Sequence, residues 1–170
     1  TFPQMATVRP GTFDDPEPEV GRKGTSFSRP YKTISEKIIV SKDTVDVDDD
    51  IGNANVLISL GNGVRNRSTV DIAYKVAELL GASVSCTRAL VDKGWMPYSA
   101  QVGQSGRTVS PDVYMAFGIS GSVQHMAGLR AKRVISVNKD RNAPLNSMAD
   151  KVVVGDADSI LKDMLRSLEE

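Results

Sequence analysis

Short apolar runs alternate with segments of helical periodicity along most of the chain, from about residue 31 to the C-terminus. The run at residues 55–60 is compact and apolar, as in a strand that is buried on both faces. After a candidate N-cap at Ser68, apolar residues recur every three or four positions, and a terminating glycine follows at Gly81. The pattern predicts a buried strand followed by an amphipathic helix.

The rest of this region repeats the alternation. Further strands are expected at residues 37–40, 83–86, 113–117, 133–137 and 151–154, and an amphipathic helix at residues 159–168. Short buried strands alternating with helices are typical of an α/β fold, a Rossmann-like parallel sheet with helices on both faces.

The first part of the chain has a different composition. Residues 1–34 are rich in proline, glycine and charge and show no sustained period, which predicts an extended arm or linker with one short strand at residues 5–9. Residues 35–170 form the expected domain. Because the chain starts at Thr1 without a methionine, we expect a processed or trimmed fragment.

The composition excludes several classes of function. Lys plus Arg and Asp plus Glu both number 21, so no net charge attracts nucleic acid or an anionic membrane. No apolar run reaches the roughly 18 residues that span a bilayer, and Cys86 alone provides no disulfide framework. The acidic run Asp46, Asp48, Asp49 and Asp50 lacks the glycine and distal glutamate of a calcium loop. We expect no nucleic-acid partner and no membrane insertion.

Polar residues and glycines follow five of the predicted strands. They are Gly61, Thr87 with Arg88, Gly118, Asn138, and Gly155 with Asp156. In a parallel sheet the carboxyl ends of the strands share one edge, and ligands bind there. The spacing therefore predicts a ligand site at this edge.

Two glycine-rich turns are candidates for phosphate contact. Gly61-Asn62-Gly63 begins like a dinucleotide fingerprint, but Asn66 stands in place of the third glycine, and a tight turn explains the pattern equally well. Residues 118–122 carry glycines and serines before a predicted helix, where free N–H groups suit a pyrophosphate. A capped helix without a ligand is the structural alternative.

Two cationic side chains have two interpretations each. His125 is the only histidine and follows Gln124 near this loop, so we expect an imidazolium that donates to a cofactor oxygen gaining charge, although lone histidines are usually structural. Arg88 either forms a surface ion pair with Asp92 or directs its charge at a redox ring.

Four segments in order resemble the C-terminal FAD-binding domain of the electron transfer flavoprotein alpha subunit. They are VDKGWMP (91–97), QVGQSGR (101–107), GISGSVQHMAG (118–128) and NKDRNAP (138–144). The similarity covers roughly residues 31–170. It implies that the arm is what remains of a preceding, mostly absent domain, and that FAD binds at the carboxyl ends of the strands.

The resemblance also implies residue roles. Ser105 would bond near flavin N5, Gln124 and His125 near the N1/O2 edge, and Arg88 over the ring system. Residues 120–122 would hold the phosphates or ribityl chain, and Asn138 and Asp156 the AMP half. The other implied contacts are Asn62, Thr87, Gln101, Val102, Gly103, Gln104, Gly118, Ser120, Gly121, Ser122 and Val123. Asn62 departs from the arginine usual in the family and supplies no cation at this position.

By this resemblance the chain is an electron carrier, not an enzyme. It would pair with a beta subunit as a heterodimer, accept single electrons from flavin dehydrogenases such as the acyl-CoA dehydrogenases of fatty acid oxidation, and pass them to a quinone oxidoreductase or other acceptor. A bifurcating variant that draws on NADH stays open. The expected location is the cytoplasm in a prokaryote and the mitochondrial matrix in a eukaryote. The alternatives are a structural module with redox-silent FAD, NAD or AMP, and an NAD-dependent dehydrogenase, which the incomplete fingerprint disfavours.

Overall fold

The computed structural model describes residues 3–8, 13, 17, 19–30 and 51–169. Within these residues five strands form one parallel sheet in the order β2-β1-β3-β4-β5. The strands are β1 (Val56–Leu60), β2 (Ser83–Cys86), β3 (Val113–Phe117), β4 (Arg133–Asn138) and β5 (Lys151–Val154). The helices are α1 (Ser68–Leu80), α2 (Arg88–Asp92), α3 (Val123–Met126) and α4 (Ala157–Glu169), with 3-10 turns η1 (Tyr98–Ala100) and η2 (Pro144–Ser147).

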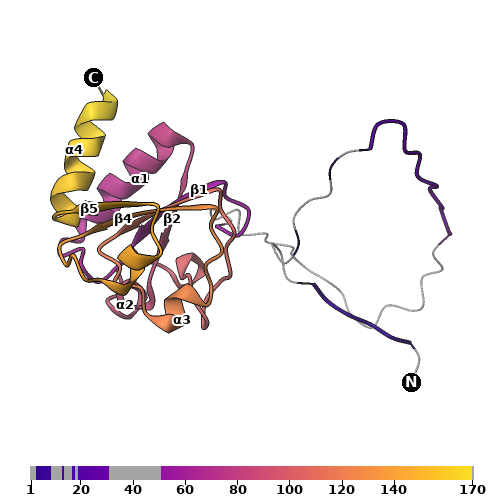
Figure 1. Ribbon diagram of the computed structural model, residues 1–170, viewed down its shortest axis with the longest axis horizontal. Helices are drawn as coiled ribbons and strands as arrows, with labels where there is room; N and C mark the ends of the chain where they lie inside the picture. Colours follow the sequence, from indigo (N-terminus) through magenta and orange to yellow (C-terminus); the bar gives the residue numbers. More distant parts are fainter. Residues whose placement is uncertain (1–2, 9–12, 14–16, 18, 31–50, 170) are drawn as a thin grey trace, which may run out of the picture.

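Helices lie on both faces of the sheet, as the alternation predicts. Figure 1 shows α1 and α4 side by side on one face and α3 on the opposite side. Successive strand residues point to opposite faces, so Ile58, Leu60 and Phe117 pack toward α1 and α4, whereas Leu57 and Tyr114 form the core of the other face. The prediction of an α/β fold is confirmed.

The predicted strands at residues 83–86, 113–117 and 151–154 have the observed bounds, and the other two described strands differ by one residue at one end. β5 is the exception to the expectation of burial, because Val152, Val153 and Val154 are 42%, 43% and 47% exposed. This strand lies at an edge of the sheet, where only β4 pairs with it among the described residues.

Helix starts were less predictable from the sequence. Ser68 is the first residue of α1 and not its N-cap; the capping position is Arg67, which makes no side-chain cap. Gly81 ends the helix in the left-handed conformation, as predicted. α4 begins at Ala157, two residues earlier than expected, because the Asp156 carboxylate accepts from the Ser159 N–H at 2.9 Å and caps this helix.

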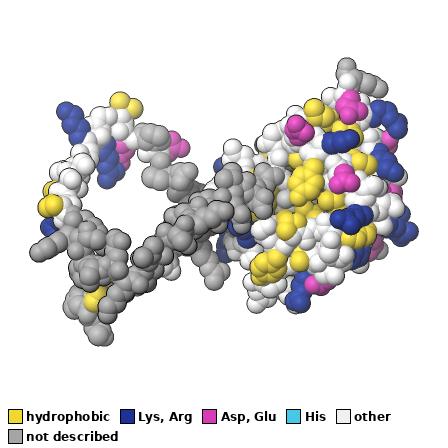
Figure 2. Space-filling view, turned by 180° about the vertical axis from the view of Figure 1, so that it is seen from behind, with side chains coloured by type: hydrophobic (Ala, Val, Ile, Leu, Met, Phe, Trp, Pro, Cys, Tyr) yellow, Lys and Arg dark blue, Asp and Glu magenta, His cyan; other side chains and the backbone are white. Residues whose placement is uncertain are grey.

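The arm contributes little regular structure where it is described. Residues 5–8 form no strand, which corrects the prediction for residues 5–9; Arg9 itself, the predicted strand at residues 37–40 and the acidic run at 46–50 lie outside the described residues. In Figure 2 basic and acidic side chains are interspersed over one face of the domain, in keeping with their equal numbers. No helix in the described part of the chain is long and apolar enough to cross a membrane.

Candidate functional site

A cavity of about 740 Å³ opens at the carboxyl ends of the strands. Its walls come from the loops that follow β1, β2, β3 and β4 and from the segment around residues 101–105. The order β2-β1-β3-β4-β5 reverses direction between β1 and β3, and in doubly wound sheets the ligand binds at such a switch point. The volume of this cavity lies within the range of ligand and cofactor pockets.

Every residue predicted to contact the cofactor lines this cavity except Val123 and Asp156. The residues that do are Asn62, Thr87, Arg88, Gln101, Val102, Gly103, Gln104, Ser105, Gly118, Ser120, Gly121, Ser122, Gln124, His125 and Asn138. Of the other lining residues, Gly63 and Ile119 lie within the two predicted glycine-rich turns, whereas Ala89, Asp140 and Ala143 were not predicted as contacts. Ala89 and Ala143 are apolar and carry no chemical signal, and Asp140 lies two positions after the predicted Asn138.

Glycines bring the loops after β1 and β3 into backbone contact. The Gly63 N–H donates to the Gly118 carbonyl at 2.8 Å. A Cβ on Gly118 would lie 2.8 Å from the Gly63 carbonyl carbon, and Gly118 also has a φ of +66°. Close approach of two backbones therefore accounts for the Gly61-Asn62-Gly63 turn, as its structural interpretation expects.

The segment after η1 presents a serine hydroxyl to the cavity. Gln101 Nε2 donates to Ser105 Oγ at 3.0 Å, and the Tyr98 hydroxyl donates to the Ser105 carbonyl. The loop is tied to α3 by a hydrogen bond of 2.7 Å from the Gln104 N–H to the Gln124 carbonyl. Since a serine hydroxyl both donates and accepts, Ser105 keeps its own proton for a ligand acceptor.

Thr87 supplies a second hydroxyl to the wall. Its Oγ1 is buried and has no hydrogen-bond partner among the described residues. Buried polar atoms are normally hydrogen-bonded, and an orphan deserves an explanation. A polar ligand atom in the cavity would provide the missing partner.

His125 differs from the expected imidazolium. The side chain is 5% exposed; Nδ1 lies 3.1 Å from the Val102 carbonyl and Nε2 lies 2.8 Å from the Tyr114 hydroxyl. A carbonyl only accepts, so Nδ1 carries the proton and Nε2 accepts from Tyr114. Burial lowers the pKa of His125, against a smaller opposing effect of the Val102 hydrogen bond. Both ring nitrogens of His125 thus have protein partners, and burial favours the neutral ring, which does not support the expected cationic donor.

Arg88 forms the predicted surface ion pair with Asp92 and also lies at the cavity. It lines the cavity, and its Nε lies 3.5 Å from Asp92 Oδ2 in an ion pair one helical turn apart. The side chain is 72% exposed. The pair contributes little to stability, and solvent weakens the field of the guanidinium.

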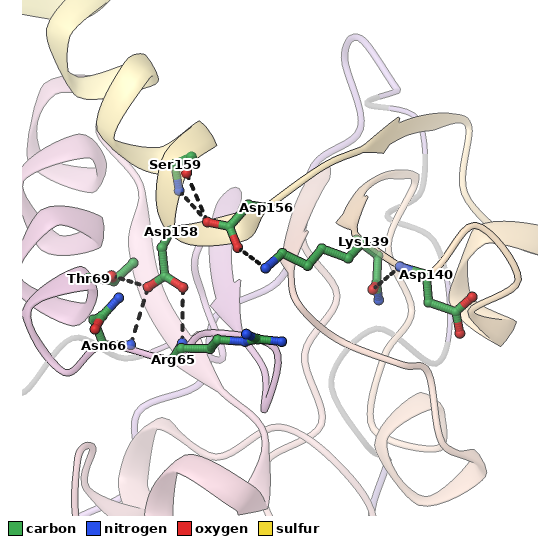
Figure 3. Close-up of polar contacts among 9 residues, drawn as sticks. Arg65, Asn66, Thr69, Lys139, Asp140, Asp156, Asp158 and Ser159 are labelled. Carbon is green, nitrogen blue, oxygen red and sulfur yellow. Dashed lines mark hydrogen bonds and ion pairs between the residues drawn. The ribbon is translucent and has the colours of Figure 1, made fainter.

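Asp156 is engaged outside the cavity. Its Oδ2 lies 2.5 Å from Lys139 Nζ and its Oδ1 accepts from the Ser159 N–H and hydroxyl (Figure 3). These partners, Lys139 first, lower the pKa of Asp156 from 3.8 to about 2. The neighbouring Asn138 does line the cavity and holds its wall, since its Nδ2 donates to the Ile119 carbonyl at 2.9 Å.

The turn at residues 118–122 leads into a helix of one turn only. Ser122 caps it by accepting from the His125 N–H at 3.4 Å. The dipole of so short a helix is small, so anion binding here depends on hydroxyl and backbone N–H donors and not on the macrodipole. The described residues contain no His, Cys, Asp or Glu cluster suited to a metal ion.

Sheet order, glycine contacts and donor-rich walls together define a nucleotide-binding domain of the doubly wound α/β class. A family model described as the electron transfer flavoprotein FAD-binding domain matches residues 50–130. This chain belongs to the family of electron transfer flavoprotein alpha subunits.

Three relatives illustrate the similarity. Protein FixB of Clostridium saccharobutylicum is 37% identical over an alignment of 177 positions that covers 99% of this chain and 52% of that protein. The electron transfer flavoprotein subunit alpha of Clostridium acetobutylicum is 36% identical over 98% of this chain and 52% of its own length. The mitochondrial subunit alpha of Arabidopsis thaliana is 40% identical over 81% of this chain and 39% of that protein. The chain spans about half the length, or less, of these curated relatives.

Proposed function

We propose that the chain binds FAD in the cavity at the β1–β3 switch point and carries electrons as part of an electron transfer flavoprotein. The observation that carries the proposal is the donor set of the wall, a buried Thr87 hydroxyl without a partner and a Ser105 hydroxyl whose proton is free for a ligand. Gly63 and Gly118 are in backbone contact in another part of the cavity wall, where neither position has room for a Cβ. These features fit a large polar cofactor.

FAD when bound supplies the capacity to accept and release single electrons, and the protein sets its orientation and potential. Ser105 would donate near flavin N5, and Gln124 would contact the N1/O2 edge. His125, as a neutral ring, would hold this edge in place through Val102 and not by its charge. The cation nearest to the ring would then be Arg88, since Asn62 replaces the usual arginine.

The phosphates and ribityl chain would lie against residues 120–122, and Asn138 would hold the AMP half. By family membership the partner is a beta subunit, the donors are flavin dehydrogenases and the acceptor is a quinone oxidoreductase. The exposed cavity wall and the exposed side chains Tyr98 and Val123 beside it fit a site that a second subunit completes.

The test is a titration of the chain with FAD, followed by stepwise anaerobic reduction of the complex. The visible absorption spectrum is recorded at each step. We expect a bound flavin with two resolved one-electron potentials. Ser105→Ala is expected to alter the separation of the two potentials more than the affinity for FAD, whereas Ser110→Ala, which removes a hydroxyl outside the cavity, leaves both unchanged. A bound flavin with the same two potentials in both variants would contradict a Ser105 contact near N5. If the chain alone retains no FAD, the titration is repeated with the beta subunit, and absence of flavin there contradicts the proposal.

A further inference from the structure

Asp158 is a buried carboxylate outside the cavity that contacts one of its loops. It lies in the first turn of α4 and is 5% exposed. Its Oδ2 accepts from the Arg65 N–H at 3.0 Å, and its Oδ1 accepts from the Asn66 N–H at 3.3 Å and from the Thr69 hydroxyl (Figure 3). All three donors come from the loop before α1 or the first turn of α1.

The start of α1 needs such an acceptor. The first N–H groups of a helix have no intrahelical partner, and the residue at the capping position, Arg67, provides no side-chain cap. Free N–H groups and the helix dipole make this end of a helix attractive to an anion. In doubly wound folds the helix after the first strand commonly receives the phosphate of a nucleotide. Here a carboxylate of the protein lies at this end of α1 and accepts from the loop N–H groups of Arg65 and Asn66, just before the helix, and from the Thr69 hydroxyl.

The same loop forms part of the cavity wall. Asn62 and Gly63 line the cavity, and Gly63 is tied to Gly118 at one end of the loop. Asp158 ties the other end, at Arg65 and Asn66. Asp156, the residue before α4, also reaches the opposite wall, because it pairs with Lys139 next to Asn138.

We propose that Asp158 is a built-in anion at the start of α1. It fixes the loop between β1 and α1 as a wall of the cavity, and it leaves the phosphates of the ligand to the loop after β3. Asp158 is thus a positioning residue, which acts through the backbone of Arg65 and Asn66. The part that concerns ligand phosphates rests on the proposed function; the loop-holding part does not.

Amide hydrogen exchange of the 170-residue chain tests the loop-holding part. In Asp158→Ala the Arg65 and Asn66 amides are expected to exchange on the order of tenfold faster or more, because a charged acceptor has been lost. Sodium formate, a carboxylate small enough for the space left, is expected to restore the slow exchange, whereas sodium chloride at equal ionic strength does not. Asp158→Asn keeps the shape and one acceptor oxygen, so it replaces the alanine variant if that variant does not fold. In Asp158→Asn the exchange of the Arg65 and Asn66 amides is expected to be accelerated to an intermediate extent. Asp163→Ala, which removes an exposed carboxylate from the same helix, is the matched control.

Unchanged exchange at Arg65 and Asn66 in Asp158→Ala, or an equal acceleration in Asp163→Ala, would overturn the proposal. The phosphate part is tested by titrating the wild-type chain with inorganic pyrophosphate and following backbone amide shifts. Shifts at residues 120–122 support it, and shifts at Arg65 and Asn66 contradict it. If the wild-type chain binds no FAD even with a beta subunit, the proposed function fails, but the exchange experiment still decides the role of Asp158.

Discussion

Replacing Gly118 by alanine tests the contact between the two loops at the switch point. Gly118 combines a φ of +66° with a position where a Cβ would lie 2.8 Å from both Cα and the carbonyl carbon of Gly63 and 2.9 Å from the Val64 nitrogen. All three neighbouring atoms are backbone, so no side-chain rotation relieves the overlap. The variant is therefore expected to move the β1–α1 loop away from the loop after β3.

The loss of stability in Gly118→Ala has two parts, and a second glycine of the chain, Gly94, allows them to be separated. An L-residue in the left-handed region costs roughly 1–2 kcal/mol, and overpacking adds typically about 1–3 kcal/mol. We expect Gly118→Ala to lower the free energy of unfolding by about 2–5 kcal/mol. Gly94 has the same φ of +66° but nothing within 4 Å of its Cβ position. Gly94→Ala therefore isolates the backbone term, about 1–2 kcal/mol.

The assay is urea unfolding of both variants and the wild type, followed by far-ultraviolet circular dichroism, with comparison of midpoints at a constant slope. The difference between the two variants measures the contact between Gly118 and Gly63, because the change in unfolded-chain entropy is common to both. Equal destabilisation by Gly118→Ala and Gly94→Ala would refute the argument that backbone packing requires glycine at position 118. FAD affinity is expected to fall in Gly118→Ala only.

Three further predictions concern charge. The pKa of Asp156 is lowered in the fold, so the stability that its carboxylate contributes is present above about pH 3.8 and is lost as the pH falls toward 2. The difference in free energy of unfolding between wild type and Asp156→Asn, measured by urea unfolding, should shrink over that window. The pKa of His125 is also lowered, so the stability that this ring contributes is complete above pH 6.5 and declines as acid protonates it. His125→Gln should therefore make the loss of stability below that pH less steep. An equally steep loss would contradict a buried neutral ring. Arg88→Ala should lower the potential of bound flavin by roughly 40–170 mV, the range between water-like and protein-like screening of a charge 4 Å away. An unchanged potential would show that the guanidinium lies away from the ring.

Much of the fold was predictable because local patterns and the tertiary structure agree. Residues 113–117 are an apolar run between Asp112 and Gly118, and the same residues form a central strand of the sheet. The location of the cavity followed from one topological rule, that parallel strands end on one edge, once Gly61, Gly118 and Asn138 had been recognised at strand ends.

The failures concern interactions between residues distant in the sequence. Ser68 has the residue type of an N-cap, but the acceptor at the start of α1 is Asp158, 90 positions later. His125 stands beside polar loop residues, yet burial lowers its pKa against the Val102 carbonyl, and tertiary packing supplies both this burial and the hydrogen bond to Tyr114. The sequence contains these residues but no local signal of their pairing.

Three hydrogen bonds that hold the cavity loops in place have a common consequence for ligand binding. Gly118 accepts from Gly63, Asn138 donates to Ile119, and Asp158 accepts from Arg65; each joins the backbone of a cavity loop to a separate element of the fold. Ordering a loop on binding costs affinity, so loops fixed by the protein's own groups reduce that cost. The Thr87 hydroxyl, which has no hydrogen-bond partner among the described residues, and the Ser105 hydroxyl, which accepts from Gln101 but donates to none of them, are then available for recognition. It follows that variants that lose one of these three hydrogen bonds should weaken ligand binding mainly by loosening the walls, whereas variants of Thr87 and Ser105 should weaken it by removing direct contacts with the ligand.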